Sequence, residues 1–143
     1  MSQPSCDRHY ESLGRRFRAN FHCEWTAGAS DNLDTQLVVS LDDVSGKFDN
    51  TRFAVESVAW ASSANVRADI YFDSMPMGPS GLIHTITSDA SSGEVSFIDW
   101  YPNGAVADPN RLSPGNVVVS TRGAQQGEEL TILITGREKG KSR

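Results

Sequence analysis

Between Val66 and Phe72 the chain alternates apolar and polar side chains with a period of two. One parity is apolar and the other mostly polar: Val66, Ala68, Ile70 and Phe72 against Arg67, Asp69 and Tyr71. Because successive side chains of a strand point to opposite faces, this pattern is typical of a strand with one buried and one solvated face. Similar short runs recur as far as Ile134, each ended by Gly, Pro, Asn or Asp. The pattern predicts antiparallel sheets packed face to face, and it supplies no chemistry.

Eight such runs are expected to form strands. They span residues 17–25, 36–41, 53–61, 66–72, 82–87, 94–100, 117–121 and 129–135. Short polar connections predict that three successive pairs form hairpins: 53–61 with 66–72, 82–87 with 94–100, and 117–121 with 129–135. The register of 53–61 is ambiguous, because both parities of this run carry large apolar side chains.

Eight short strands without a convincing helix predict the fold class. We expect an all-β antiparallel two-sheet sandwich, jelly-roll or immunoglobulin-like, with an extended N-terminal arm. The size of the chain, 143 residues, suits one domain with its own core. The expected organisation is a basic arm over 1–20 with one helical turn near residues 8–13, a sandwich over 21–136, and a basic tail over 137–143.

Charge is distributed unevenly along the chain. Residues 1–20 carry a net charge of +2, residues 137–143 carry +3, and residues 21–136 carry −10, within a total of −5. An acidic body of this kind repels nucleic acid. Two short basic ends on such a body are expected to lie on an acidic neighbour or on another copy, although basic ends that serve only solubility remain the simpler alternative.

The environment of the chain is predicted from its apolar runs and its cysteines. No apolar run approaches the length of a membrane span, and the polar start MSQPSCD does not resemble a signal peptide. We therefore expect a soluble protein made and used in a reducing compartment. Two cysteines do not form a disulfide framework, so Cys23 is expected to be a small core residue and Cys6 a thiol on the arm; the sequence does not decide whether the two ever pair.

The sequence does not nominate a catalytic or metal site. His84 lies within an expected strand, no serine occupies a Gly-x-Ser-x-Gly turn, and no glycine-rich loop suits a phosphate. Four zinc-type ligands occur near the N-terminus, but His22 and Cys23 are adjacent in a strand and point to opposite faces. Asp69 and Asp73 share a wet strand face with Arg67, which favours a solvated charge face over a glycosidase pair. We expect no enzyme activity, cofactor or metal.

Two further segments are candidate contact surfaces. An aromatic run ends in Trp100 and Tyr101, and an apolar loop contains Met75 and Met77. If these side chains are exposed, they are typical of protein contacts, and the aromatic pair could also stack against a sugar. If they fold back, they cover the end of the core. The expected partner-binding residues combine both segments with the basic ends: Arg15, Arg16, Arg18, Met75, Met77, Trp100, Tyr101, Arg137, Lys139 and Lys141.

Five segments between residues 55 and 137 form a recognisable series of a Trp-bearing strand, the strand after it, an aromatic turn and two closing segments: VESVAW (55–60), VRADIYFD (66–73), DWYPNGAVADP (99–109), GNVVVSTRGA (115–124) and ELTILITGR (129–137). In this series the chain resembles small β-sandwich virion structural proteins of tailed bacteriophages. The resemblance implies a structural role without activity, either as a capsid decoration or cement protein or as a tail or head–tail junction component. The first 50 residues carry no matching signature.

Together these observations predict a virion structural protein, made in the host cytoplasm, that stabilises neighbouring capsid subunits. Its expected partners are the major capsid protein or other virion proteins and further copies of itself, without nucleic acid or membrane. A carbohydrate-binding or adhesin sandwich that uses Trp100 and Tyr101 is the alternative. An enzyme would require a dry pair of catalytic groups, for example in a deep pocket around His84.

Overall fold

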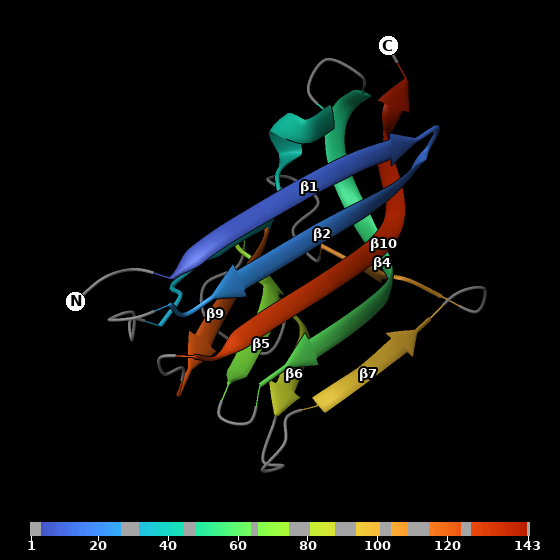
Figure 1. Cartoon of the computed structure of the whole chain (residues 1–143). Coiled ribbons are helices and arrows are strands. Elements are labelled where there is room, and N and C mark those ends of the chain that lie inside the picture. Colours follow the sequence, from blue (N-terminus) through green and yellow to red (C-terminus); the bar gives the residue numbers. More distant parts are fainter. Residues whose placement is uncertain are drawn as a thin grey trace.

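The chain folds into two antiparallel β-sheets that pack against each other (Figure 1). This computed structural model describes residues 4–26, 32–44, 48–63, 66–74, 81–87, 94–100, 104–108, 115–123 and 127–142. Its elements are β1 (Ser5–Leu13), β2 (Arg16–Glu24), β3 (Gln36–Val39), the 3₁₀ turn η1 (Leu41–Val44), β4 (Phe48–Ser62), β5 (Arg67–Phe72), β6 (Leu82–Thr87), β7 (Glu94–Asp99), β8 (Val106–Ala107), β9 (Val117–Arg122) and β10 (Glu129–Ser142). The predicted all-β, two-sheet antiparallel class is confirmed.

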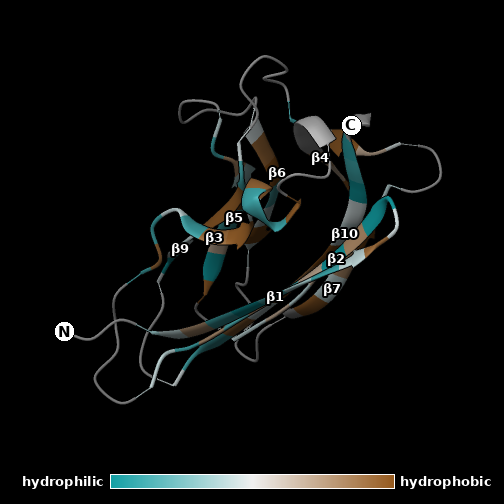
Figure 2. Ribbon diagram, turned by 90° about the horizontal axis from the view of Figure 1, so that it is seen from above, coloured by the Kyte–Doolittle hydropathy of each residue, from teal (hydrophilic) through white to brown (hydrophobic). Residues whose placement is uncertain are grey.

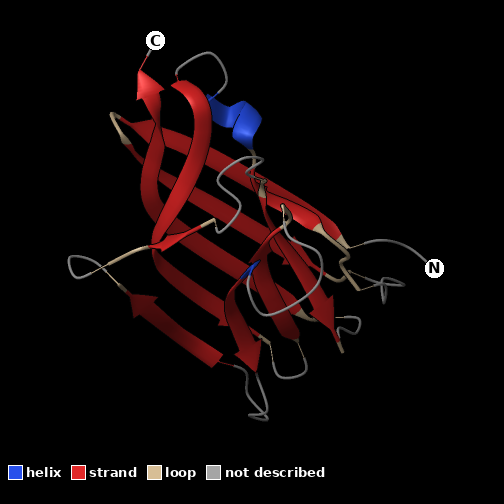
Figure 3. Cartoon of the chain, turned by 180° about the vertical axis from the view of Figure 1, so that it is seen from behind, coloured by secondary structure: helices blue, strands red, loops and turns tan. Residues whose placement is uncertain are grey.

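The larger sheet has six strands and the smaller has four. The larger runs in the order β1-β2-β10-β4-β7, with the short β8 also paired to β4, and the smaller runs β3-β9-β5-β6. Seen from above, the two sheets form two layers (Figure 2), and buried apolar residues of both sheets belong to one cluster. Seen from behind, η1 lies at the end of the sandwich where β10 ends (Figure 3).

The core consists mainly of apolar residues from the alternating sequence runs. All four apolar residues of the run from Val66 to Phe72 are buried, and so is the parity Phe17, Ala19, Phe21, Cys23 and Trp25. These two sets come from different sheets and meet in one apolar cluster, as face-to-face sheet packing requires.

A β-bulge resolves the ambiguous register of residues 53–61. Opposite β10, the pairing steps from Ser57 with Thr135 to Val55 with Gly136, which leaves Glu56 as the extra residue. Phe53 and Val55 therefore enter the core on one side of the bulge, and Val58 and Trp60 enter it on the other side. A Cβ at Gly136 would lie 2.2 Å from the Ala54 carbonyl oxygen, so the close approach here requires glycine.

All three hairpins predicted from the sequence are wrong. β4 and β5 belong to different sheets, as do β6 and β7, and β9 and β10. The physical reason is one of reach: sheets pack about 10 Å apart, a distance that even a four-residue connection spans. Short polar connections mark where strands end, but they do not decide whether the chain returns to the same sheet.

The two basic ends are strands rather than an arm and a tail. β1 is extended, as expected of the arm, but it pairs with β2 along its whole length, and the helical turn near residues 8–13 is wrong. Gly14, with φ at 75°, lies in the turn between these strands. β10 continues past Arg137 and pairs with β4 as far as Ser142. The sandwich therefore includes residues that were expected to lie outside 21–136, because both segments complete hydrogen-bond ladders of the larger sheet.

Candidate interaction surface

The fold brings the two basic ends of the sequence together at one end of the larger sheet. Arg16 of β2 lies directly opposite Arg137 of β10, and Arg18 lies opposite Thr135. These arginines point away from the smaller sheet, since the alternate residues Phe17 and Ala19 are in the core. We call this side of the larger sheet the outer face, and we call Arg16, Arg18, Arg137 and Lys139 the basic corner.

Two carboxylates partly neutralise the basic corner. Glu56, the bulged residue, lies 3.3 Å from both Arg16 Nη1 and Arg137 Nε, and its side chain is only 6% exposed. Glu11 lies 2.6 Å from Arg18 Nη2 in a more exposed pair. Four basic groups against two acidic groups leave the corner with a net charge of +2.

A polar cluster fixes the inner side of the same corner. Glu138 of β10 is 1% exposed, and its carboxylate accepts a hydrogen bond from the Tyr10 hydroxyl. Ser12 Oγ also donates to this carboxylate and lies 3.1 and 3.2 Å from its two oxygens. Burial, together with the adjacent Glu138 carboxylate, raises the pKa of Tyr10 well above its ordinary value, so the phenol stays a neutral donor. The Glu138 N–H donates to the Arg15 carbonyl oxygen at 2.8 Å. This cluster holds the ends of β1 and β10 in place beneath the basic corner.

A second polar contact, an ion pair, joins β1 to η1. Arg8 donates two hydrogen bonds to the carboxylate of Asp43, at 2.9 and 3.2 Å, across from the larger sheet to the 3₁₀ turn. Because β1 is an edge strand with mostly exposed residues, such polar ties contribute to its attachment where apolar burial is small.

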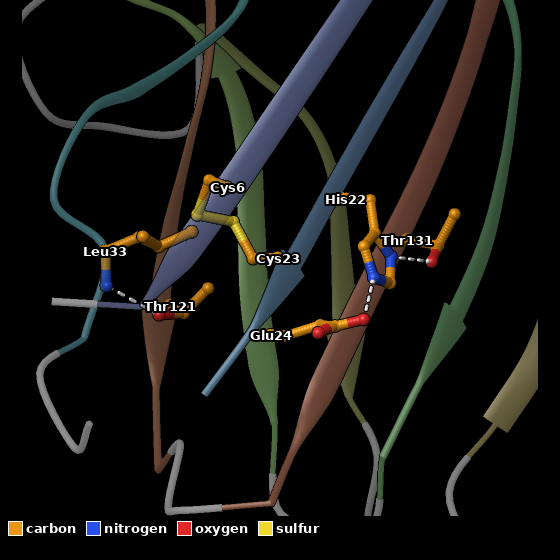
Figure 4. Close-up of a disulfide and its surroundings, with 7 residues drawn as sticks. All are labelled: Cys6, His22, Cys23, Glu24, Leu33, Thr121 and Thr131. Carbon is orange, nitrogen blue, oxygen red and sulfur yellow. Dashed lines mark hydrogen bonds and ion pairs between the residues drawn. A yellow bond between two sulfur atoms is a disulfide. The ribbon is translucent and has the colours of Figure 1, made fainter. Parts of the chain in front are cut away.

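Cys6 and Cys23 form a disulfide between β1 and β2, which answers the question of pairing that the sequence leaves open and shows that the interpretation of Cys6 as an arm thiol is wrong (Figure 4). The two residues are directly opposite each other in the strand pair. A signal for this pairing exists in the sequence: Cys6 and Cys23 are equally distant from the turn at Gly14 and Arg15. A hairpin centred on that turn therefore places them side by side.

The other zinc-type ligands lie apart from the disulfide sulfurs. His22 points to the outer face, where its two ring nitrogens contact Thr131 Oγ1 at 2.7 Å and Glu24 Oε1 at 3.0 Å (Figure 4). Among the described residues, no group of three or more His, Cys, Asp or Glu side chains is arranged to hold a metal ion.

The centre of the outer face is a cross-strand row that sequence reasoning missed. Pairing places five residues side by side across the larger sheet, and we call them the central row: His9, Asn20, Leu133, Ala59 and Phe97. Phe97 is 70% exposed, and its neighbour on the same face of β7, Val95, is 85% exposed. The sequence does contain a signal for this exposed apolar side of β7. Val95 and Phe97 alternate on one face of the strand, and Ile98 lies on the other.

The aromatic run after Phe97 divides between surface and core. Phe97 faces solvent, whereas Ile98 and Trp100 are half-buried and pack against the apolar cluster. Tyr101 lies outside the described residues, as do Met75 and Met77. Of the remaining expected contact residues, Arg15 lies in the turn between β1 and β2, and Lys141 pairs in register with Asp49 of β4.

The outer face of the smaller sheet carries a polar network. Thr85 Oγ1 donates to Asp69 at 2.9 Å, and Arg122 lies 3.5 Å from the same carboxylate. The Tyr71 hydroxyl contacts Ser120 Oγ at 3.0 Å and Thr35 Oγ1 at 3.3 Å. Asp69 and Tyr71, two polar residues of the alternating run from Val66 to Phe72, thus contact side chains of neighbouring strands.

His84 lies on the inner side of β6. Its ring centroid is 4.4 Å from that of Trp60, which is a core residue of β4. This places it between the sheets, in contact with an aromatic ring.

No helix in the described part of the chain is long and apolar enough to cross a membrane. Comparisons with known proteins found no matching family model, no matching curated protein and no matching solved structure. The function of this chain is therefore argued from its own surfaces.

Proposed function

We propose that this chain is a non-enzymatic structural protein of a tailed-phage virion, most specifically a capsid decoration or cement protein that bridges neighbouring shell subunits. The observation that carries the proposal is the basic corner. Charges that are separated by more than a hundred residues in sequence meet on one exposed sheet face of a chain with a net charge of −5. Such a corner suits an acidic protein surface, while the acidic remainder disfavours nucleic acid and anionic membranes.

The disulfide supports a location on the outside of a particle. Disulfides persist in oxidising surroundings, which include virion surfaces, and are rare in a reducing cytoplasm. A chain made in the host cytoplasm acquires the Cys6–Cys23 bond once it is exposed to such surroundings. The bond then fixes the edge strand β1.

The outer face also suits a cement role mechanically. It is a broad sheet surface with a rigid core beneath it, and it presents charged and apolar groups together. Many copies of a protein with a modest contact stabilise a repeating shell strongly, because contacts on one lattice add through multivalency. The expected partners are the major capsid protein, other virion proteins and further copies of this chain.

The test is purification of particles of the virus that encodes the chain, followed by quantitative mass spectrometry. We expect the chain in many copies per particle, and its absence from particles would overturn the proposal. The charge reversals Arg18→Glu and Lys139→Glu in the basic corner should reduce its amount on particles. Arg122→Glu, a matched reversal on the smaller sheet, should leave that amount unchanged.

Two outcomes would redirect the proposal. Labelled chain found only at the tail or the head–tail junction would replace the decoration role with the junction role. Binding to a glycan array that is lost in Trp100→Ala, without any association with particles, would instead favour the carbohydrate-binding alternative.

A further inference from the structure

We propose that the outer face of the larger sheet binds a second copy of this chain, face to face, about a twofold axis that runs across the strands along the central row. The inference deepens the proposed assembly role by naming a second copy as the acidic protein surface that contacts the basic corner, and it rests on that role for its biological setting. It names one partner, one surface and one symmetry. The physical basis is the order of side chains on this face, which the strand pairing fixes row by row.

The rows on either side of the central row differ in charge. Beyond it toward the ends of β1 and β10 lies the basic corner; Asp99 of β7 shares the row of Arg18, so the described side chains of this end carry a net charge of +1. In the opposite direction the face ends in three exposed carboxylates, Asp7, Glu24 and Glu129. His22, which shares this end, pairs with Glu24. One face thus has a basic end, a central row with apolar groups, and an acidic end.

This order is complementary to itself under one twofold axis. An axis across the strands, in the plane between two copies, reverses the strand direction of the partner. It places Arg16 and Arg137 of each copy opposite Glu24 and Glu129 of the other, while Arg18 lies over His22 and Glu11 lies over Asp7. An axis along the strands would instead place like charges together, which is unfavourable. The Arg16–Glu24 and Arg137–Glu129 pairs therefore favour the axis across the strands over the axis along them.

The central row supplies the apolar part of the contact. Under the proposed axis, Leu133, Ala59 and Phe97 each lie over the same residue of the partner. Exposed phenylalanine is typical of the residues on which interface affinity depends. The small side chain of Ala59 allows two sheets to approach to the ordinary stacking distance of about 10 Å.

The dimensions of the face also suit a stable dimer. Five strands about 4.8 Å apart, over about nine residues of about 3.4 Å rise, cover roughly 700 Å² on each copy. Standard protein interfaces bury about 800 Å² on each partner. In Figures 1 and 2, no described element lies on this face, which points away from the smaller sheet.

The experiment is sedimentation of the purified full-length chain over a range of concentrations. We expect a monomer–dimer equilibrium that weakens as salt rises, since the charged ends contribute across the interface. Phe97→Asp should raise the dimer Kd by about thirtyfold, the scale expected for one central interface aromatic. Leu82→Asp is the matched control, because Leu82 is exposed on β6 of the smaller sheet, and it should leave the Kd unchanged.

A thiol-specific crosslinker tests the symmetry. Phe97→Cys places a thiol of each copy near the axis, so a short bismaleimide should join two copies, whereas Leu82→Cys should not crosslink. A chain that stays monomeric at its highest soluble concentration, or a dimer unaffected by Phe97→Asp, would overturn the inference. Loss of dimer formation with retained binding to particles would leave the proposed function standing, and a dimer that never joins particles would refute only that function.

Discussion

The sandwich has two outer faces of opposite character. On the smaller sheet, Asp69 and Tyr71 contact hydroxyls and an arginine of the neighbouring strands. On the larger sheet, Phe97 and Val95 face solvent, and charge is concentrated at the two ends. An alternating strand can therefore present either a closed polar network or a surface for a partner. Its cross-strand neighbours decide which.

Attachment of the edge strand also distinguishes the larger sheet. β1 depends on a disulfide, on the Tyr10–Glu138 hydrogen bond and on the Arg8–Asp43 pair. These contacts hold the strand that completes the outer face. Variants that loosen them should therefore affect the larger sheet's face and leave the smaller sheet's network intact.

The largest expected effect comes from removing the disulfide. Cys6→Ala together with Cys23→Ala should lower the free energy of unfolding by about 3 kcal/mol, the value for a bond that closes a loop of this length. For a domain of this size the loss corresponds to a fall of about 10 °C in Tm. Thermal unfolding followed by circular dichroism measures it. A reductant should lower the Tm of the wild-type chain similarly and leave that of the variant unchanged; an equal response in both would contradict the prediction.

A matched pair of tyrosines gives the next effect. Tyr10→Phe removes a donor from the buried Glu138 carboxylate and should cost about 2 kcal/mol, as expected for a hydrogen bond to a charged group. Tyr71→Phe removes the same atom from the exposed network and should cost about 0.5 kcal/mol, because water replaces its contacts. Urea unfolding of both variants measures the difference. Equal losses would show that the two faces do not differ in this way.

The sequence predicted which residues are buried better than which strands pair. The alternation from Val66 to Phe72 is a local property, and the structure buries every apolar residue of that run. Pairing is not local: β2 and β10 are separated by most of the chain, so the meeting of Arg16 and Arg137 could not be predicted from either end alone. The short connection at residues 62–65 suits a hairpin as well as a crossing between sheets.

The candidate surface was partly predictable for the same reason. The basic residues were identified from the sequence, but their contacts with Glu56 depend on a bulge opposite Gly136. The ambiguous alternation of residues 53–61 indicates an irregular strand but does not locate the bulge. To predict the disulfide, the turn at Gly14 has to be recognised as the centre of a hairpin. The bulge follows from pairing between strands that are distant in sequence, which a period of two does not encode, whereas the disulfide follows from a local hairpin.

Stability at alkaline pH should distinguish Tyr10 further. Burial and the Glu138 carboxylate raise its pKa in the folded state, whereas in the unfolded chain it ionises near its ordinary value of about 10. Above about pH 10 the unfolded state therefore loses a proton that the folded state keeps, and the free energy of unfolding falls as pH rises. Tyr10→Phe should remove this part of the pH dependence, and Tyr71→Phe should retain it. Urea unfolding at about pH 8 and about pH 11 checks both; parallel slopes for the two variants would contradict the prediction.

The smallest effects come from neutralising one carboxylate on each outer face. Glu56→Gln keeps the shape of a nearly buried side chain but removes the charge between Arg16 and Arg137, and should cost about 1 kcal/mol. Asp69→Asn alters an exposed pair with Arg122 and should cost less than about 0.5 kcal/mol. Urea unfolding in low and high salt measures both, and salt should reduce the smaller effect further because exposed charges are screened. An Asp69→Asn loss as large as that of Glu56→Gln would mean that the smaller sheet's network contributes as much to stability as the ion pairs of the basic corner.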